Sequence, residues 1–309
     1  MSKAGTAARP RVISPQKRRR FFSRNDKFTL GFFIGIPTLL HVGLVWFPAL
    51  ATIYLSFTYW TGINPEDIVW AGLANYENIF FNTPIFWEAL RVNAIWLGWF
   101  FLIATPLGVL LAYQIDREIR GHKFYQSAYY LPVVLSLAVT GIIWNFLLRP
   151  DGFVNGLLGR DLTDAISFFG DDRYNIWVIM IMASWRHIGY IMLLYLAGLK
   201  AVDAALREAA TIDGATEWQT FRKVVFPAMR PVNIIVLVIT IIESLRAFDM
   251  VYIIYGSSGG LPILGVLVFN NIAGEGASMK GAAYAVILFL LSIVPIIAYL
   301  NQQFKEDAK

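Results

Sequence analysis

The sequence contains no cysteine and few charged residues. None of the 309 residues is Cys, and Asp, Glu, Lys and Arg together make up 15% of the chain, against about 25% in a typical soluble domain. The absence of cysteine excludes a disulfide scaffold, a Cys-ligated zinc or iron–sulfur site and a thiol nucleophile. Hydrophobic residues make up 57%, and the mean hydropathy is +0.56. This composition argues against a soluble enzyme and against disorder, and favours a lipid environment.

Six apolar segments are long enough to cross a bilayer, which requires about 20 mostly apolar residues per helix. They lie near residues 28–57, 92–113, 125–148, 176–199, 232–254 and 281–301. Several contain a proline, which we interpret as a local kink in each case: Pro37, Pro48, Pro106, Pro132 and Pro295. The sequence therefore predicts an all-α integral membrane protein with six transmembrane helices.

The distribution of Lys and Arg sets the expected orientation. Nine precede residue 28 and five lie in 200–231, whereas 58–90 has none and 255–280 has one. Positive charge accumulates on the cytoplasmic side of membrane proteins. Both termini are therefore expected in the cytoplasm, flanking a membrane domain over 28–303 with a tail at 304–309. The basic tail 1–27 is expected to lie on anionic lipid headgroups rather than on nucleic acid.

The segment 200–231 is polar but regularly patterned, and it predicts a helix–turn–helix on the cytoplasmic face. Gly214 is expected to end the first helix by adopting a positive φ. Thr216 followed by Gln219 has the spacing of a capping box. An apolar stripe at helical spacing follows, formed by Trp218, Phe221, Val224 and Val225. Two prolines are expected to end this second helix before the fifth span, Pro227 and Pro231.

This segment resembles the EAA loop of bacterial ABC importer permeases, whose pattern is EAA, three residues, Gly, nine residues, Ile, one residue, Leu-Pro. The chain has Glu208-Ala209-Ala210, then Gly214, Val224 and Phe226-Pro227 at these spacings, with Val and Phe as conservative departures. The wider run 184–231 resembles the carbohydrate-uptake branch, of the maltose and glycerol-phosphate importer first-permease type. The stretches 247–249 and 258–262 resemble the FD…GGP region of that branch, with Leu261 inserted.

The resemblance implies that the loop couples the membrane domain to a separate ATPase. The residues that it assigns to this role are Glu208, Ala209, Ala210, Asp213, Gly214, Ala215 and Pro227. The implied partners are a second homologous permease, two cytoplasmic ATPase subunits and an extracytoplasmic substrate-binding protein. The sequence has no Gly-x-x-x-x-Gly-Lys-Ser/Thr loop. ATP and magnesium are therefore expected on the partner ATPase, this chain is not expected to be an enzyme, and no cofactor is expected on it. The implied location is the bacterial cytoplasmic membrane.

Polar residues inside the third, fourth and fifth spans are candidates for a translocation path, because ionisable groups in a span usually face a cavity or a partner. The candidates are Asn145, Arg186, Tyr190, Glu243, Arg246, Asp249 and Tyr252. The alternative is a structural ion pair of Arg246 with Glu243 or Asp249. His187 is interpreted as a packing residue, and no His, Asp or Glu spacing indicates a metal site.

Two other functions compete with the importer. Gly256-Ser257-Ser258-Gly259 matches a motif of intramembrane serine proteases, but all three histidines precede it, whereas the base in that class follows the serine. The intramembrane charges would equally serve an ion-gradient-driven secondary transporter, but such a transporter gives the patterned loop no role. The sequence therefore favours the permease subunit of an ABC importer for a sugar, oligosaccharide or related polyol phosphate.

Overall fold

The computed structural model describes residues 24–60, 64–256, 260–273 and 279–307. The chain divides into two compact units, Met1–Ala51 and Thr52–Lys309. Most of the predicted basic tail 1–27 lies outside the described residues. The fold is predominantly helical, with four continuous helices that are long and apolar enough to cross a membrane, or up to six spans when two bent pairs are included. This agrees with the predicted six-span, all-α class.

The first unit contains α1 (Arg24–His41), the π-helical turn η1 (Val42–Trp46) and the start of α2 (Phe47–Leu55). Together they make the continuous apolar helix Phe28–Leu55, close to the predicted first span.

Proline explains the π-helical turns of the chain. In three places a π turn ends two residues before a proline: η1 before Pro48, η3 (Phe100–Ala104) before Pro106, and η4 (Phe221–Val225) before Pro227. Proline has no N–H to donate, and its ring crowds the carbonyl four residues earlier. Each π turn contains the carbonyl that the proline ring would crowd. The extra residue in the turn widens the helix at this point and so makes room for the ring. Pro48 and Pro106, which were expected to kink their helices, and Pro227, which was expected to end one, each follow a π turn.

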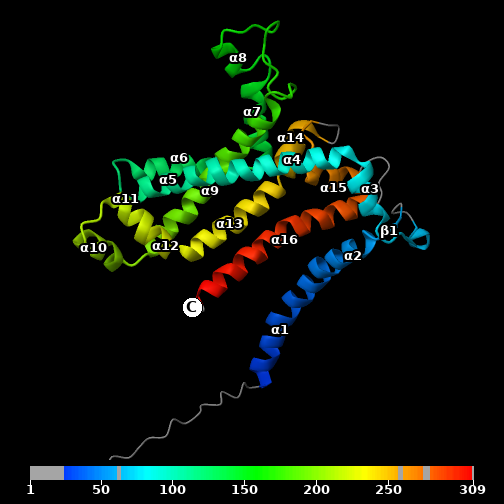
Figure 1. Cartoon of the computed structure of the whole chain (residues 1–309), viewed down its shortest axis with the longest axis horizontal. Helices are drawn as coiled ribbons and strands as arrows, with labels where there is room; N and C mark the ends of the chain where they lie inside the picture. Colours follow the sequence, from blue (N-terminus) through cyan, green and yellow to red (C-terminus); the bar gives the residue numbers. More distant parts are fainter. Residues whose placement is uncertain (1–23, 61–63, 257–259, 274–278, 308–309) are drawn as a thin grey trace, which may run out of the picture. The chain divides into compact units, whose positions relative to one another are not determined.

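Three continuous helices form the frame of the second unit (Figure 1). One runs over Pro84–Asp116 as α4 (Pro84–Trp99), η3 and α5 (Thr105–Asp116), and the others are α9 (Asn175–Ala201) and α16 (Lys280–Asp307). Helices α5 and α9 pack closely at Gly108, where a Cβ would lie 2.8 Å from Ile191 Cβ. Such small-residue contacts are typical of helix pairs in membranes, where close van der Waals packing drives association.

Two predicted spans are not continuous helices. Residues 125–148 divide into α6 (His122–Val134) and α7 (Leu137–Leu148), bent by 102°. Residues 232–254 divide into α13 (Arg230–Leu245) and α14 (Phe248–Tyr255). The segment before α13 comprises α11 (Glu217–Thr220), η4 and α12 (Phe226–Ala228), and it meets α13 at 78°. The third span therefore breaks next to Pro132, where a kink was expected, and the fifth is interrupted at Arg246 and Ala247.

A local helix cap and one hydrogen bond from a distant segment stabilise the break between α6 and α7. Ser136 accepts the N–H of Val139 at 3.2 Å and so caps the start of α7. The carbonyl of Pro132 lies in the last turn of α6, and the Nε of Arg186 on α9 donates to it at 3.2 Å. A cationic side chain at a helix C-terminus also offsets the negative end of the helix dipole. Apolar composition alone does not reveal such a break.

The segments predicted as loops contain additional short elements. Residues 58–90 hold β1 (Thr58–Tyr59), the 3-10 turn η2 (Pro65–Asp67), β2 (Val69–Trp70) and α3 (Ala74–Asn82), and β1 and β2 are antiparallel. Residues 149–175 hold α8 (Phe153–Leu157), and 255–280 hold α15 (Leu264–Ala273). The fully buried Asn75 donates to the carbonyls of Ser56 and Thr58, each at 2.9 Å, and so joins α3 to the hairpin.

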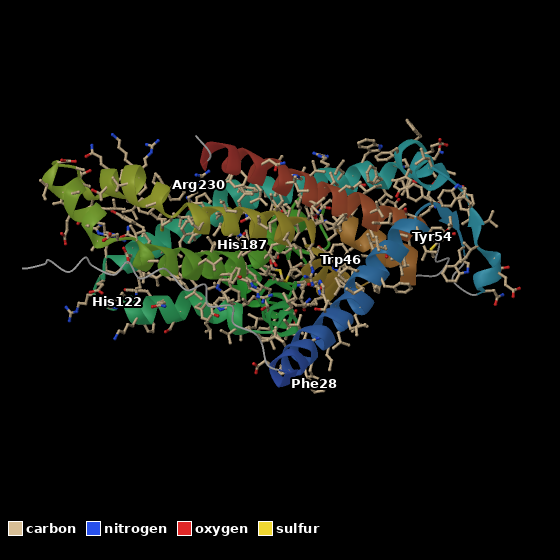
Figure 2. The ribbon with its side chains drawn as sticks, turned by 90° about the horizontal axis from the view of Figure 1, so that it is seen from below. Phe28, Trp46, Tyr54, His122, His187 and Arg230 are labelled. Atoms are coloured by element: carbon tan, nitrogen blue, oxygen red, sulfur yellow. The ribbon has the colours of Figure 1, made fainter. Side chains whose placement is uncertain are left out.

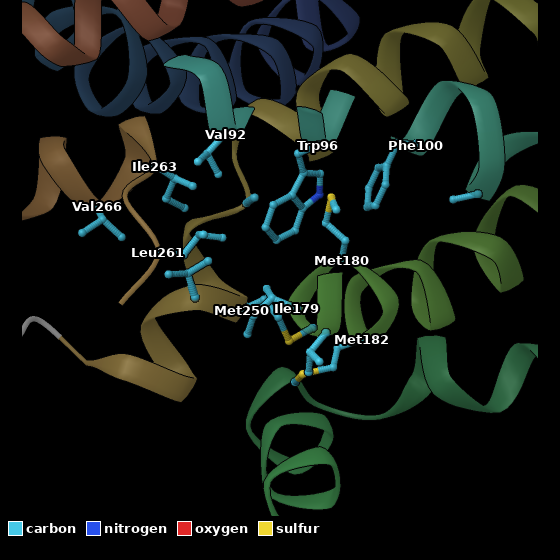
Figure 3. Packing of buried hydrophobic residues seen from close by; sticks show 14 of the residues in the cluster. Val92, Trp96, Phe100, Ile179, Met180, Met182, Met250, Leu261, Ile263 and Val266 are labelled. Carbon is cyan, nitrogen blue, oxygen red and sulfur yellow. The ribbon is translucent and has the colours of Figure 1, made fainter. Parts of the chain in front are cut away.

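The largest buried cluster of the second unit lies between α4, α9 and α14 (Figure 3). It includes Trp96, Met180 and Met250, and also Leu261 and Ile263 from the segment before α15. Leu261, which departs from the family pattern, is therefore a core residue. The backbone beside it needs glycine, because Gly260 has φ +93° and a Cβ there would lie 2.3 Å from the ring of Tyr255.

Asn93 on α4 joins three segments that are far apart in the sequence. It is fully buried, its Nδ2 donates to the carbonyls of Ser244 and Leu245 at 3.2 and 3.4 Å, and its Oδ1 accepts the N–H of Leu264 at 2.9 Å. These bonds provide partners for two backbone carbonyls at the end of α13 and for the backbone N–H of the first residue of α15. Asn93 therefore holds the interruption between α13 and α14 in place.

Replacing Asn93 by leucine is expected to destabilise the protein by about 2–4 kcal/mol, because buried backbone groups lose their partners. The melting temperature in detergent should fall by roughly 5–10 °C. Asn93→Asp retains the acceptor for Leu264 but not the donors, and should lie between wild type and Asn93→Leu. An unchanged melting temperature in Asn93→Leu would contradict this role.

Candidate functional site

A cavity of about 340 Å³ lies in the second unit among α4, α6, α7, α9, α13 and α14. Five of the predicted path residues line it: Arg186, Tyr190, Glu243, Arg246 and Asp249. The rest of the wall is aromatic and aliphatic and includes Trp96 and Phe100. The long-range packing of three helices thus brings together residues that the sequence identified one at a time.

The cavity lies where helices are interrupted. Val133 and Leu137 in its wall flank the break between α6 and α7, and Arg246 and Ala247 are the two residues between α13 and α14. Non-helical backbone at membrane depth is tolerated where it is buried in protein or lines a cavity that can hold water. Interrupted helices that meet at one cavity are a recurring way to build a binding site inside a membrane.

The ionisable groups of the wall do not form the ion pair considered as an alternative. Ion pairs within 4.0 Å in the described part of the chain include Arg117–Glu217, Arg149–Asp151, Arg173–Asp171 and Arg207–Asp116, and none of them involves a residue of this wall. Arg246 therefore pairs with neither Glu243 nor Asp249. The wall presents two guanidinium groups and two carboxylates to one small volume.

His187 in the same wall is a packing residue, as predicted. Its ring stacks on Phe100 at a centroid distance of 4.3 Å, and its Nε2 lies 3.1 Å from the hydroxyl of Thr105. That hydroxyl lies 3.2 Å from the hydroxyl of Thr240, so one chain of hydrogen bonds joins α9, α5 and α13. Figure 2 shows His187 among the helices of this unit.

The other two candidates lie elsewhere. Asn145 lines a second cavity of about 270 Å³ between α7 and α14. Tyr252 packs against Phe248 and Phe269, with ring centroids 5.0 and 4.9 Å apart. Conversely, sequence analysis missed Trp96 in the main cavity. Its spacing of three residues from Asn93, a polar residue inside a span, was the available signal.

Three observations bear on the alternatives based on catalysis. No group of three His, Asp or Glu residues there could hold a metal ion. Asp171 in the 149–175 segment accepts two charge-assisted bonds from Arg173, which lower the pKa of this carboxyl to about 2. The two residues of this ion pair are close neighbours in the sequence, which is ordinary for a solvated loop. The serines of the protease motif, Ser257 and Ser258, lie outside the described residues.

A second candidate site is the segment 203–229, which we call the elbow. Helix α10 (Ala204–Ile212) begins at Asp203, whose carboxylate accepts the N–H of Ala205 at 3.0 Å. The turn that follows contains Gly214 at φ +77°. Thr216 and Gln219 then form the predicted capping box, with bonds of 2.8 and 3.3 Å. The segment thus contains two helices joined by a turn, with Gly214 at the positive φ that was expected.

The end of the second elbow helix differs from the prediction. Pro227 was expected to end it, but the helical segment continues through η4 and α12 to Ala228, because the π turn accommodates the proline. The chain turns at Met229, and Pro231 lies in the first turn of α13. Thus only Pro231 marks a boundary, and it does so by starting the next helix, a position that tolerates proline.

One face of the elbow is exposed and mixes apolar and acidic groups. Glu208, Ala209 and Asp213 are exposed, and the Ile212 side chain is 86% exposed. The neighbouring Ala210 is buried. This face therefore presents an apolar side chain next to carboxylates, with nothing in the described part of the chain covering Ile212.

The opposite face of the elbow is attached to the end of α5. Arg207 pairs with Asp116 at 2.8 Å and donates to the carbonyl of Leu199 at 2.9 Å. Glu217 pairs with Arg117 at 2.5 Å, but the two side chains are 70% and 45% exposed. The rings of Tyr113, Trp218 and Phe221 pack together beside these pairs, with centroids 4.7 to 5.7 Å apart. Figure 1 shows the elbow at one end of the unit.

With both sites described, the comparison with known proteins decides the family. The family model described as "Binding-protein-dependent transport system inner membrane component" matches residues 27–305. This chain belongs to that family. It is therefore a membrane component of a transport system and not an enzyme.

Named relatives agree with this assignment. A probable ABC transporter permease protein of Pyrococcus horikoshii is 32% identical over 89% of this chain and 95% of its own length. A probable starch degradation products transport system permease protein of Thermoanaerobacterium thermosulfurigenes is 33% identical over 93% and 98%. Among solved structures, a bacterial ABC transporter involved in the import of the acidic polysaccharide alginate matches with a TM-score of 0.75. It covers 93% of this chain and 98% of its own at 21% identity. That last match shows the shared fold.

Proposed function

We propose that this chain is the permease subunit of an ABC importer for a sugar, oligosaccharide or related polyol phosphate. The charged cavity would form the translocation path. The observation that carries this proposal is the convergence of Arg186, Glu243, Arg246 and Asp249 on one cavity at two helix interruptions. Relatives named for starch degradation products, arabinooligosaccharides and xylose or arabinose support the carbohydrate class.

The elbow would dock on a separate cytoplasmic ATPase. Its exposed face offers Glu208 for a basic partner residue, Ile212 for an apolar pocket, and Ala209 for close helix contact. Its other face is attached to α5 and α9 through Arg207. Movement of the docked ATPase would therefore be transmitted to the spans that line the cavity. In this arrangement both termini and the elbow are cytoplasmic, in keeping with the Lys and Arg distribution.

The complete transporter would contain a second, similar permease, two ATPase subunits and an extracytoplasmic binding protein. ATP and magnesium would bind the ATPase subunits. The solved alginate transporter in complex with a pentasaccharide-bound periplasmic protein is a precedent for the binding-protein partner.

Affinity purification from the native host tests this proposal. The tagged chain, extracted in mild detergent, is expected to retain an ATPase and a second permease, identified by mass spectrometry. In proteoliposomes with the binding protein, the transported sugar, oligosaccharide or polyol phosphate should stimulate ATP hydrolysis and be taken up. Recovery of this chain alone, with uptake that survives ATP depletion, would instead support a secondary transporter.

A further inference from the structure

A second cavity of about 330 Å³, which we call the elbow cavity, lies between the elbow and the ends of α5 and α9. It shares no lining residue with the cavity of the proposed translocation path. Its volume is in the range of small-molecule binding sites. Figure 1 shows α11 of the elbow beside the end of α5. A ligand held in the elbow cavity would therefore contact the elbow and two spans at once.

The wall of the elbow cavity presents a strong acceptor and a strong donor. Arg207 donates to one carboxylate oxygen of Asp116, and no hydrogen bond reaches the other oxygen from the described residues, although this side chain is only 11% exposed. Arg117 pairs with Glu217 and still has N–H groups to donate, because a guanidinium group carries five. The two arginines and the two carboxylates leave the wall without net charge.

Thr220 adds a polar group that lacks a partner. It lines the elbow cavity and is 9% exposed, and its hydroxyl makes no hydrogen bond among the described residues. This hydroxyl is not one of the fully enclosed unpaired atoms of that part of the chain, so it remains accessible from the cavity. Buried polar groups are nearly always bonded, so an unpaired one calls for an explanation. A ligand in the elbow cavity provides it.

The elbow cavity lies where two spans end, near one surface of the membrane. Tyr113 and Leu199 in its wall belong to the last turns of α5 and α9. Trp218 stacks on Phe221 of the wall, with ring centroids 5.4 Å apart, and is 52% exposed. An exposed tryptophan at the end of a span is typical of the headgroup layer. Phospholipid headgroups therefore have direct access to this site.

The chemistry of the wall selects among phospholipids. A wall without net charge gives the anionic headgroup of phosphatidylglycerol no net attraction. Phosphatidylcholine and phosphatidylethanolamine are both neutral overall, with one phosphate and one cation each. Only the primary ammonium of phosphatidylethanolamine has N–H groups, which the unpaired oxygen of Asp116 can accept.

We propose that the elbow cavity binds the headgroup of phosphatidylethanolamine, with its ammonium on Asp116 and its phosphate on Arg117 and Thr220. The bound headgroup would join the end of α5 to α11 and so brace the elbow against the spans. This site is distinct from the proposed translocation path and from the exposed face of the elbow, and it does not depend on which substrate is transported.

Two variants and a matched control isolate the site. Arg117→Gln removes the phosphate donor, and Thr220→Val removes the hydroxyl while keeping the shape of the side chain. Because that hydroxyl is unpaired in the protein alone, Thr220→Val should leave the melting temperature in lipid-free detergent unchanged or raise it. Arg120→Gln is the control, since Arg120 is an exposed arginine of the same turn that does not line the elbow cavity.

Lipid titrations followed by native mass spectrometry of the affinity-purified, delipidated protein test the proposal. The probes are dioleoyl-phosphatidylethanolamine, -phosphatidylcholine and -phosphatidylglycerol. Wild type is expected to bind the first about tenfold more tightly than the other two, the effect of one charge-assisted hydrogen bond. Arg117→Gln should raise the Kd of phosphatidylethanolamine about tenfold, and Thr220→Val about 3- to 10-fold. Arg120→Gln should leave it within about twofold.

Glycerophosphoethanolamine, which has the same headgroup without acyl chains, distinguishes a membrane lipid from a soluble ligand. It should bind at least about tenfold more weakly than the lipid, because it has no chains to bury. Equal binding of the two would overturn the lipid as the ligand. Equal Kd values for the three lipids, a preference for phosphatidylglycerol, or unchanged binding in Arg117→Gln and Thr220→Val would overturn the site. A lower melting temperature of Thr220→Val without lipid would assign the hydroxyl a structural role instead. None of these readouts involves transported substrate, so the proposed function is tested separately.

Discussion

Gly214→Val is expected to abolish substrate uptake while the protein still reaches the membrane at wild-type levels. Gly214 has φ +77°, and a Cβ at this position would meet nothing within 4 Å. The effect therefore comes from the backbone alone, because the left-handed conformation costs a β-branched residue at least about 1–2 kcal/mol. Relief of that strain would change the angle between α10 and α11 and so misplace the exposed face.

A graded series separates this cause from a loss of space. Gly214→Asn should keep most of the uptake, since asparagine tolerates positive φ, whereas Gly214→Pro should be as inactive as valine. Rates of ATP-dependent uptake in proteoliposomes and recovery of the ATPase on the tagged chain provide the readouts. Normal uptake by Gly214→Pro would contradict a role for this turn.

Glu208 on the exposed face of the elbow allows a second test, in which its charge is reversed. Glu208 is exposed, and no hydrogen bond or ion pair involves it among the described residues. Glu208→Lys should therefore leave the melting temperature unchanged and act only through a partner, with uptake reduced at least tenfold. The control is Lys223→Glu, a reversal at another exposed position of the elbow. Equal effects of the two reversals would indicate general electrostatics rather than a specific contact.

Local sequence signals predicted the elbow well, because its turn chemistry depends on residues within one or two turns. The positive φ of Gly214 and the Thr216–Gln219 capping box follow from neighbouring residues alone. By contrast, the helix breaks in the third and fifth spans depend on bonds to distant segments. Arg186 reaches Pro132 from 54 residues away, and Asn93 reaches Ser244 from 151 residues away.

The cavity was predicted in part. Ionisable residues are costly inside a span, so the sequence identified Arg186, Glu243 and Arg246 as candidates before any contact was known. It could not separate a cavity from an ion pair, because that depends on side-chain distances set by packing. Trp96 was missed because its place in the cavity wall depends on long-range packing, and its spacing of three residues from Asn93 does not by itself indicate a cavity.

The expected effect of breaking the elbow's attachment is a transporter that hydrolyses ATP but moves little substrate. Arg207 joins three segments, since it pairs with Asp116 at the end of α5 and donates to the carbonyl of Leu199 in α9. The Asp116 side chain is only 11% exposed. Arg207→Met would leave it nearly buried and unpaired, at a cost of about 3–5 kcal/mol.

The elbow should nevertheless keep its own fold in Arg207→Met, because Asp203 and the Thr216–Gln219 pair cap its helices independently of Arg207. The measurement is substrate moved per ATP hydrolysed, expected to fall at least fivefold. Removing both charges in Arg207→Met/Asp116→Leu should restore the melting temperature but not this ratio. Glu217→Ala is the matched control, since its pair with Arg117 is exposed and worth under about 1 kcal/mol. Normal coupling in the double variant would mean that the ion pair of Arg207 and Asp116 is needed for stability alone. A ratio that stays low in the double variant would mean that force from the ATPase reaches the cavity through Arg207.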